Sequence, residues 1–286
     1  MRHSLRYGLL GVMAVLLMGA TPPAPEAVES SAAVEATSAA VTPHIMAHRA
    51  FYRMQLASAK NGSDVRGADG MMIFEWKDAC DGWAIEQRLD VDFTHGESEG
   101  VNLASTFIAW ESKDGTRYRF NYRRLGNGQE VEAYRGTATL SAPGGEGKAT
   151  YTQPAPKEVV LPVGTYFPTS HTMAMLQAAV AGKPLFSAGV FDGTDAAGLS
   201  DISAVIGRRR PVQVALARTG SESEPDISWP VRMAFFPVTG DQAEPDYEMD
   251  TTLLPNGVSE FMLIDYGDFK LRGALEKIEV LPKPDC

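Results

Sequence analysis

Apolar and polar residues alternate along most of this chain. The clearest run extends from position 83 to position 93, with charged residues at most of the intervening positions. Its apolar members share one parity and are Trp83, Ile85, Leu89, Val91 and Phe93. A repeat of two residues separates the two sets onto opposite faces of a β-strand, whereas a helix would mix them. The run therefore predicts a strand with one buried face and one face in water.

The same alternation predicts strands along the rest of the chain. They are expected at His48–Ser58, Met71–Lys77, Leu103–Glu111, Thr116–Arg124, Gln129–Arg135, Val212–Ala217, Val231–Phe236, Tyr247–Leu253, Ser259–Tyr266 and Phe269–Leu275. Glycine and asparagine residues that tolerate positive φ separate several of these runs, which is typical of hairpins. Sequential hairpins form an antiparallel meander. We expect a mainly β fold in which one antiparallel sheet curls into a broken, partly open barrel.

One segment has the pattern of a helix. Thr169 or Ser170 can cap the first amide groups, Phe167 can pack as a hydrophobic staple, and Gly182 can end the helix. These signals predict one short helix near 169–181. It is either an ordinary core helix or a plug inside the curled sheet.

The N-terminal segment does not share the strand pattern. Arg2 and Arg6 precede a short apolar run and small residues, which indicates a secretory signal peptide at 1–20. The run is too short to span a membrane, which needs about 20 residues. Residues 21–43 are rich in Ala and Pro and predict a disordered linker. We expect a single β domain at 44–286, soluble in the periplasm, with no transmembrane segment in the mature form.

The charge of the chain excludes one class of partner. The formal net charge is −10, and nucleic-acid binding depends on lysine and arginine side chains that displace counterions. The interleaved arginines and aromatic residues between Arg117 and Arg124 superficially resemble a stacking surface for bases. A β-strand with one solvent-exposed face accounts better for this alternation of arginines and aromatic residues.

The two cysteines are placed where a disulfide could hold the end of the chain against an early turn. Cys80 lies in a turn between two predicted strands, and Cys286 is the last residue. An exported chain enters an oxidising compartment, which favours a structural disulfide between them. A metal site, a redox pair and two free thiols are the alternatives. A metal site lacks clustered ligands, and a redox pair usually has Cys-x-x-Cys spacing.

Patterns that would indicate catalysis are weak. His171 and Asp192 could orient a serine such as Ser170 or Ser187 in an envelope hydrolase. However, the Gly-x-Ser-x-Gly nucleophile elbow is absent from the sequence, and a capping or buried role for His171 fits better. Asp265 and Asp268 could imitate a glycosidase pair, but turn carboxylates are commoner. We therefore predict that the chain is not an enzyme.

No cofactor or metal is expected. His44 and His48 have the spacing of zinc ligands on a helix, but no third ligand is evident. Glycine patterns for phosphate or dinucleotide binding are missing.

Several short motifs along the chain together resemble those of a known protein family. In order, they are His48-Arg-Ala-Phe-Tyr52, Cys80-Asp-Gly-Trp83, Glu111-Ser-Lys-Asp-Gly115, Tyr118-Arg-Phe120, Leu161-Pro-Val-Gly-Thr-Tyr-Phe-Pro-Thr-Ser-His171, Phe191-Asp-Gly193, Asp265-Tyr-Gly-Asp-Phe269, Leu281-Pro282 and Cys286. With these motifs the chain resembles the EipB-type family of alphaproteobacterial cell-envelope integrity proteins, formerly a domain of unknown function. Within them, Trp83, Phe167, His171 and Asp192 are candidates for a binding or structural role.

The resemblance implies a periplasmic β-spiral with a disulfide between Cys80 and Cys286. It also implies a role in envelope integrity under stress, and it carries over no catalytic residue. The expected function is a noncatalytic periplasmic protein that acts through a protein or lipid partner. The alternative is a carrier of lipids or lipoproteins, with an apolar trough that could be lined by Met71, Met72, Trp76, Trp110, Phe235 and Phe236. These residues could equally form an ordinary closed core.

Overall fold

The computed structural model describes residues 41–96, 100–213, 226–238 and 244–286. The predicted signal peptide at 1–20 and nearly all of the predicted linker at 21–43 lie outside these residues. Residues Ala40–Cys286 form one compact unit.

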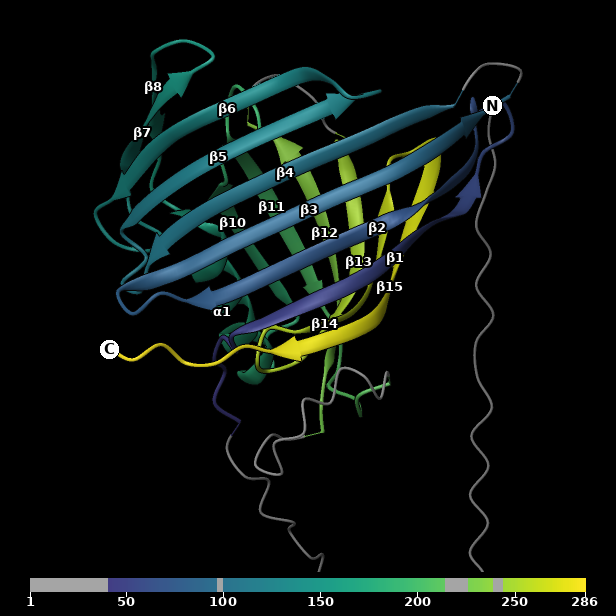
Figure 1. The fold of residues 1–286 in the computed structure, drawn as a ribbon. Coiled ribbons are helices and arrows are strands. Elements are labelled where there is room, and N and C mark those ends of the chain that lie inside the picture. The colour runs from purple at the N-terminus through teal and green to yellow at the C-terminus, as the bar shows by residue number, and fades with distance from the viewer. Residues whose placement is uncertain (1–40, 97–99, 214–225, 239–243) are drawn as a thin grey trace, which may run out of the picture. The chain divides into compact units, whose positions relative to one another are not determined.

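Within the described residues, fifteen strands form a single sheet (Figure 1). They are β1 (His48–Ala59), β2 (Val65–Asp78), β3 (Gly82–His95), β4 (Val101–Ser112), β5 (Arg117–Gly126), β6 (Gln129–Leu140), β7 (Gly147–Gln153), β8 (Lys157–Leu161), β9 (Thr165–Tyr166), β10 (Leu185–Phe191), β11 (Leu199–Ile206), β12 (Trp229–Pro237), β13 (Tyr247–Leu253), β14 (Ser259–Asp265) and β15 (Phe269–Val280). The sheet curls into a nearly closed barrel with a seam. The predicted fold class is confirmed.

The first and last strands of the chain pair in the middle of the sheet. The order is β8-β7-β6-β5-β4-β3-β2-β1-β15-β14-β13-β12-β11-β10-β9. β1 runs antiparallel to β15, with His48 opposite Val280 and Ala59 opposite Phe269. The sheet therefore consists of two meanders, β1–β8 and β10–β15, joined by the most distant strands in the sequence, and β9 adds to the second meander in parallel with β10.

Curling brings the two ends of the sheet together at the seam. The Gly164 N–H donates to the Gly144 carbonyl at 2.9 Å, and the Lys157 ammonium donates to the Ala196 carbonyl at 2.9 Å. Aromatic rings also meet there, since Tyr118 stacks on Phe167 with ring centroids 4.8 Å apart. Backbone and side-chain contacts thus close the barrel where no strand pairing does.

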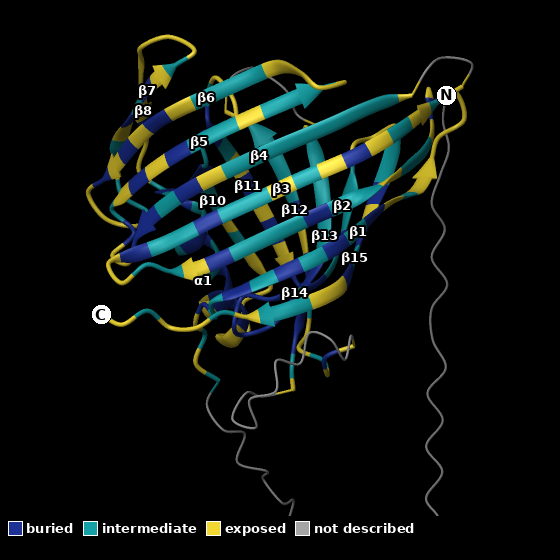
Figure 2. Cartoon of the chain, viewed as in Figure 1, coloured by how far each residue is buried: buried dark blue, intermediate teal, exposed yellow. Residues whose placement is uncertain are grey.

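The alternation of the sequence decides which face is buried. Along β5, Tyr118 and Phe120 are buried, whereas Arg117 and Arg119 between them are exposed (Figure 2). Because each buried aromatic side chain contributes about 1.5–3 kcal/mol relative to an exposed one, a one-residue slip of register would be costly. The inner face therefore sets the pairing of the sheet.

Five strands were not predicted, namely β7, β8, β9, β10 and β11. Small residues occupy inward positions of several of them, such as Ala149, which is fully buried, and Ala188 in β10. Such positions give a weak hydrophobic signal. The predicted strand at Val212–Ala217 is wrong where it is described, because Val212 and Gln213 lie outside the strands. The Gln213 N–H donates to the Glu260 side-chain carboxylate instead of to the backbone carbonyl of a neighbouring strand. Residues 214–217 lie outside the described residues.

The predicted helix is present as α1 (Pro168–Val180). It ends as expected, because Gly182 has a φ of +69°, and the N–H groups of Gly182 and Lys183 donate to the carbonyls of Ala179 and Ala178. Its start differs from the prediction. Phe167 is itself the N-cap residue, and neither Thr169 nor Ser170 occupies that position.

The antiparallel order places two sets of turns at opposite ends of the barrel. We call the end with the β1–β2 turn (60–64) and the β14–β15 turn (266–268) the mouth. The opposite end, with the β2–β3 turn (79–81) and α1, is the base. At the base, the Trp76 indole N–H donates to the Thr169 hydroxyl at 3.2 Å. The helix therefore packs against the base of the barrel.

Candidate functional site

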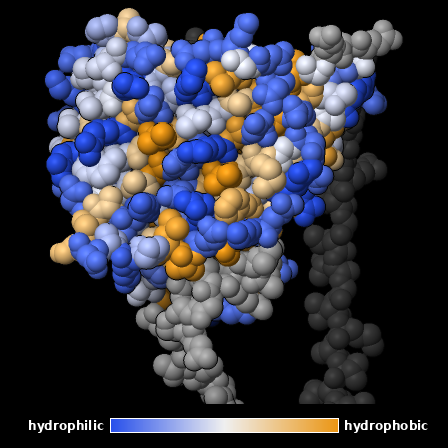
Figure 3. Space-filling view, in the orientation of Figure 1, coloured by the Kyte–Doolittle hydropathy of each residue, from blue (hydrophilic) through white to orange (hydrophobic). Residues whose placement is uncertain are grey.

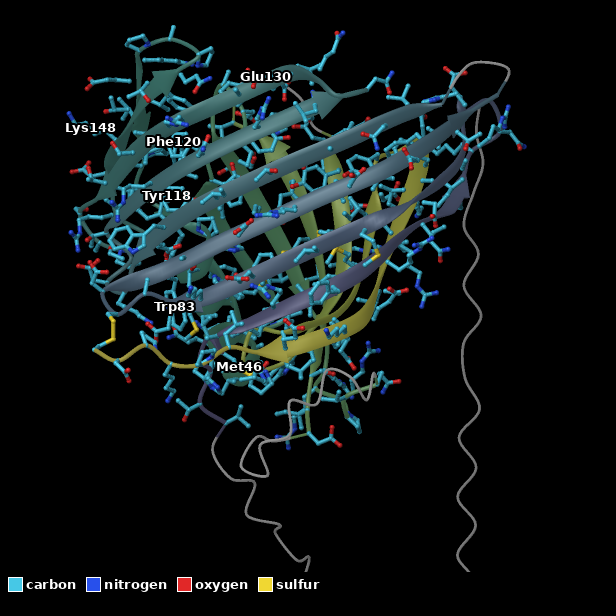
Figure 4. All side chains as sticks on the ribbon, in the orientation of Figure 1. Met46, Trp83, Tyr118, Phe120, Glu130 and Lys148 are labelled. Carbon is cyan, nitrogen blue, oxygen red and sulfur yellow. A yellow bond between two sulfur atoms is a disulfide. The ribbon has the colours of Figure 1, made fainter. Side chains whose placement is uncertain are left out.

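The predicted disulfide is present at the base. It joins Cys80 to Cys286 across a sequence separation of 206, with Cα atoms 5.9 Å apart (Figure 4). Cys80 has a φ of +64°, and its N–H donates to the Asp78 carboxylate at 3.0 Å. The turn thus presents Cys80 to the end of the chain, and the bridge holds the tail after β15 against the base.

Trp83 supports the same turn. The Lys113 ammonium lies 3.2 Å from the centroid of the Trp83 ring and 3.0 Å from the Asp78 carboxylate. Trp83 is half-buried against the core. A cation over an indole ring at a partly exposed site contributes about 0.5–1 kcal/mol. These contacts tie the β2–β3 and β4–β5 turns together and favour a structural role for Trp83.

A buried carboxylate caps α1 from across the seam. Glu111 of β4 is only 1% exposed, and its two oxygens accept from the N–H groups of Thr169 at 2.7 Å and Ser170 at 2.8 Å. Burial raises the pKa of Glu111, and these hydrogen bonds oppose the rise. A negative charge at a helix N-terminus satisfies free amide groups and interacts favourably with the helix dipole. Phe167, which precedes α1, is fully buried against Tyr118. Glu111 was not among the predicted site residues.

His171 is a buried member of the helix. Its side chain packs on Phe186, with ring centroids 5.4 Å apart, and its Nε2 has no hydrogen-bond partner among the described residues. Burial lowers the pKa of His171 to about 4. The imidazole is therefore neutral at physiological pH.

Asp192 lies directly after β10, on the inner side of the barrel. Its Oδ1 accepts from the N–H and the hydroxyl of Thr194, at 2.9 and 2.8 Å. Burial raises the pKa of Asp192 to about 6, and the two hydrogen bonds from Thr194 oppose the rise. The carboxylate closes its own loop in an Asx turn.

The structure does not join His171 and Asp192 in a catalytic pair. No hydrogen bond connects them in the described part of the chain, and a His–Asp pair would raise the pKa of the histidine, whereas that of His171 is lowered. Ser170 exchanges hydrogen bonds with the Phe167 backbone. Ser187 donates to Ser203 on the exposed face of β10. The arrangement that a hydrolase would need is not formed by these residues.

The two groups give opposite dependences of stability on pH. Unfolded histidine binds a proton below pH 6.5, but folded His171 does so only below about pH 4, so its contribution to stability grows as pH rises through this window. Folded Asp192 keeps its proton up to about pH 6, while the unfolded group loses it near 3.8, so its contribution shrinks. Each change amounts to up to roughly 3 kcal/mol.

We therefore expect the His171→Gln variant to have a free energy of unfolding that decreases as pH rises from 4 to 6. The Asp192→Asn variant should have one that increases over the same range, because each variant removes one of two opposing terms. Urea unfolding at half-unit pH steps measures the three curves. Parallel curves for wild type and both variants would contradict these assignments.

The described surface has a pocket at the mouth. Its volume is about 480 Å³. Its lining residues are Ser58, Ala59, Lys60, Glu244, Pro245, Asp246, Tyr247, Glu248, Asp265, Tyr266, Gly267, Asp268, Phe269 and Lys270. They come from the end of β1, the start of β13 and the β14–β15 turn. We call this cavity the mouth pocket.

Three aromatic rings of the mouth pocket contact one another, and we call Tyr247, Tyr266 and Phe269 the mouth rings. The ring centroids of Tyr247 and Tyr266 are 6.0 Å apart, and those of Tyr266 and Phe269 are 5.2 Å apart. The row continues into the barrel, because Phe235 stacks on Tyr247 at 4.2 Å and Phe93 meets Phe269 edge-on at 5.8 Å. Tyr266 nevertheless keeps 43% of its surface exposed. Large rings at a concave, partly exposed position are typical of binding sites.

The carboxyl groups of the pocket do not form a glycosidase pair. The Lys270 ammonium lies 2.7 Å from the Asp265 carboxylate, and this hydrogen bond lowers the pKa of Asp265. A general acid needs a raised pKa. Asp268 accepts a hydrogen bond from the Lys60 backbone N–H through its backbone carbonyl, and this bond does not involve its carboxylate.

The predicted trough residues divide between the two faces of the sheet. Met72 and Trp76 are buried in the core, and Phe235 stacks on Tyr247. Met71 and Phe236 neighbour inward residues in their strands and so face outward. The last member, Trp110, also faces outward, because the Arg119 guanidinium lies 4.4 Å from its ring centroid. Figure 3 shows this outer face of β1–β6 as a mixture of hydrophilic and hydrophobic side chains. The six residues do not form one continuous trough.

His48 is held as a core residue. Its Nδ1 lies 2.9 Å from the Met46 carbonyl, and its ring packs near Phe74 and Trp76. Within the described ranges, no three His, Cys, Asp or Glu side chains come together as a metal site would require. In the same ranges, no helix combines the length and apolarity needed to cross a bilayer.

Comparison with known proteins places this chain in a family. The family model described as EipB-like matches residues 39–282. The chain belongs to the EipB-like family. The resemblance predicted from the sequence motifs is thereby confirmed.

Two similar proteins extend the comparison. The cell envelope integrity protein EipB of Brucella abortus (strain 2308) is 30% identical over 249 residues, which cover 86% of this chain and 88% of that protein. The crystal structure of a beta-barrel-like protein of domain of unknown function DUF1849 from Brucella abortus is also similar. It has a TM-score of 0.75 and 27% identity, and the match covers 84% of this chain and all of that one.

Proposed function

We propose that this chain is a noncatalytic periplasmic protein that supports the integrity of the cell envelope by binding an envelope protein or lipid at the mouth. The observation that carries the binding part is the contact of the three mouth rings in a pocket of about 480 Å³. The envelope part is supported by the 30% identity to a protein named for cell envelope integrity.

Export is part of this proposal. The basic residues Arg2 and Arg6, the short apolar run and the small residues after it support a signal peptide at 1–20, with a linker at 21–43 before the β domain at 44–286. The disulfide between Cys80 and Cys286 supports an oxidising compartment. N-terminal sequencing of the protein from a periplasmic extract tests this. A mature chain that still begins at Met1 in the cytosol would contradict it.

A noncatalytic role is supported by the placement of the polar groups. His171 packs at the base end on Phe186, Asp192 is bonded within its own loop, and Asp265 is neutralised by Lys270. Each of these groups has a structural partner instead of a second reactive group.

The carrier of lipids or lipoproteins remains a second candidate. Met72, Trp76 and Phe235 do face the inside of the barrel, and Phe74 and Phe107 pack beside them without being fully buried. Native mass spectrometry of protein purified from cells without detergent distinguishes the two. Stoichiometric co-purified lipid that Tyr266→Ala does not displace would favour the carrier, and consistently empty protein would argue against it.

Deletion of the gene tests the proposed function. We expect the deletion strain to grow normally in plain medium and to lose viability at least tenfold on detergent or on a cell-wall antibiotic. The wild-type gene supplied on a plasmid should restore growth. A deletion strain that is indistinguishable from wild type under both stresses would contradict the proposal.

A further inference from the structure

We propose that the mouth pocket binds a segment of a partner protein that carries at least two lysine or arginine side chains. This inference rests on the proposed function, because it names the partner for the same pocket. It combines three features of that pocket: its aromatic rings, its excess of carboxylates and the spread of these carboxylates over two chain segments.

The mouth rings offer faces that no cation among the described residues occupies. Elsewhere the protein places its own cations over two half-buried rings, with Lys113 over Trp83 at 3.2 Å and Arg119 over Trp110 at 4.4 Å. Among the described residues, none of the cation–ring contacts involves a mouth ring. Tyrosine and phenylalanine faces attract ammonium and guanidinium groups. The mouth rings are therefore suited to cations from a partner.

Carboxylates exceed lysines around these rings. Five carboxylates and two lysines line the pocket, and the ammonium of one lysine, Lys270, is bound to Asp265. In the part of the chain that the structure describes, the remaining four carboxylates form no ion pair. They are Glu244, Asp246, Glu248 and Asp268. The pocket thus has negative charge that an incoming cation would complement.

The distribution of charge favours a polypeptide as the occupant. Half of the lining residues are charged, so an acyl chain in this pocket would lie against groups that are costly to desolvate. The carboxylates come from both the start of β13 and the β14–β15 turn, so a single ammonium group would meet only some of them. Several cations spaced along an extended segment can reach both sets while aliphatic side chains cover the mouth rings.

Titration with defined probes tests the inference. The basic probe is acetyl-Lys-Leu-Lys-Leu-Lys-amide, and the acidic probe replaces each lysine by glutamate. By NMR we expect the full-length mature protein to bind the basic probe with submillimolar affinity and to show shifts confined to the mouth pocket. The affinity should fall several-fold when salt is raised from about 20 to about 300 mM, because the charges are exposed.

Matched variants locate the site. Asp246→Lys with Asp268→Lys reverses two exposed charges of the pocket, and we expect at least tenfold weaker binding of the basic probe. Asp201→Lys with Glu276→Lys makes the same change of charge at exposed positions outside the pocket and should bind as wild type does. Tyr266→Ala, which removes an exposed ring, should also weaken binding at least tenfold.

Four results would overturn the inference: no shifts with the basic probe at millimolar concentration, equal binding of the two probes, equal weakening by both charge-reversal pairs, or spermidine binding as tightly as the peptide. Binding to phosphatidylethanolamine vesicles without binding to the peptide would also overturn it and would assign the pocket to a lipid.

The failure of this inference can be separated from that of the proposed function. If the peptide does not bind but Tyr266→Ala still fails to restore stress resistance in a deletion strain, the mouth functions with a partner of other chemistry. If Tyr266→Ala restores full resistance, the proposed function fails as well.

Discussion

Replacing Cys286 with serine will lower the free energy of unfolding by about 3–5 kcal/mol. The disulfide closes a loop across 206 residues, and a cross-link of that span restricts the unfolded chain more than almost any other pair in this protein could. The folded sheet should persist, because β15 stays paired with β1 along most of its length. Urea unfolding followed by circular dichroism measures the change.

The control for this prediction is the variant in which both Cys80 and Cys286 are serine. It should have the same stability as the single variant and as reduced wild-type protein, since all three lack the same cross-link. A loss below 1 kcal/mol in all three proteins would contradict the assigned role of the disulfide.

Replacing Glu111 with alanine will lower the free energy of unfolding by about 3 kcal/mol. The substitution removes two hydrogen bonds to a charged acceptor and leaves the N–H groups of Thr169 and Ser170 buried without a partner. It also removes the contact that joins β4 to α1 across the seam. Hydrogen exchange of the amides in 168–180 should therefore accelerate more than that of β1 to β3.

Glu111→Gln provides an internal comparison. A carboxamide has one acceptor oxygen, so it can satisfy only one of the two amide groups, and we expect about half of the loss. Glu276→Ala, at an exposed position on β15, serves as the control and should change stability by less than about 0.5 kcal/mol. Equal stability of Glu111→Ala and wild type would show that the cap does not hold the helix.

Much of the fold follows from the alternation of the sequence. The strand from Trp83 to Phe93 lies within β3, and the run Tyr247–Leu253 coincides with β13, because large apolar residues mark the inward positions of both. The disulfide could be predicted from compartment and position alone. The helix could be placed from Gly182 and from the residues around Pro168.

The seam could not be predicted, because it depends on contacts between segments far apart in the sequence. Glu111 is a charged residue at an inward position of β4, which interrupts the apolar parity of Phe107 and Ala109. That interruption is the signal that could have drawn attention to it. Its partner, the start of α1, lies 58 residues later, and nothing local in the sequence connects the two.

The sequence indicated single residues of the mouth pocket but not that they lie together. Asp265 and Asp268 attracted attention as carboxylates, and Tyr247 was only the first residue of a predicted strand. The register of β13 and β14, in which Glu248 pairs with Asp265, places Tyr247 beside Tyr266. The β1–β15 pairing then brings Ala59 to Phe269. A pocket formed by three turns needs all of these registers at once.

His171 and Asp192 illustrate how residue types that occur in catalytic sites can suggest catalysis where their role is structural. Both lie in the sequence motifs on which the predicted resemblance rested, and both have shifted pKa values, which also occur at active sites. Here both shifts arise from burial, which favours the neutral form of each group, and no hydrogen bond joins the two side chains in the described part of the chain. Their role is better tested by stability than by activity.

Restoration of stress resistance in a deletion strain tests most directly whether the mouth or the His171–Asp192 pair carries the function. Two variants should be compared at equal periplasmic abundance: His171→Gln with Asp192→Asn, and Tyr266→Ala with Asp268→Lys. We predict that the first restores growth on detergent as wild type does and that the second does not. Full restoration by the mouth variant, together with failure of the other, would contradict a noncatalytic protein that acts through its mouth.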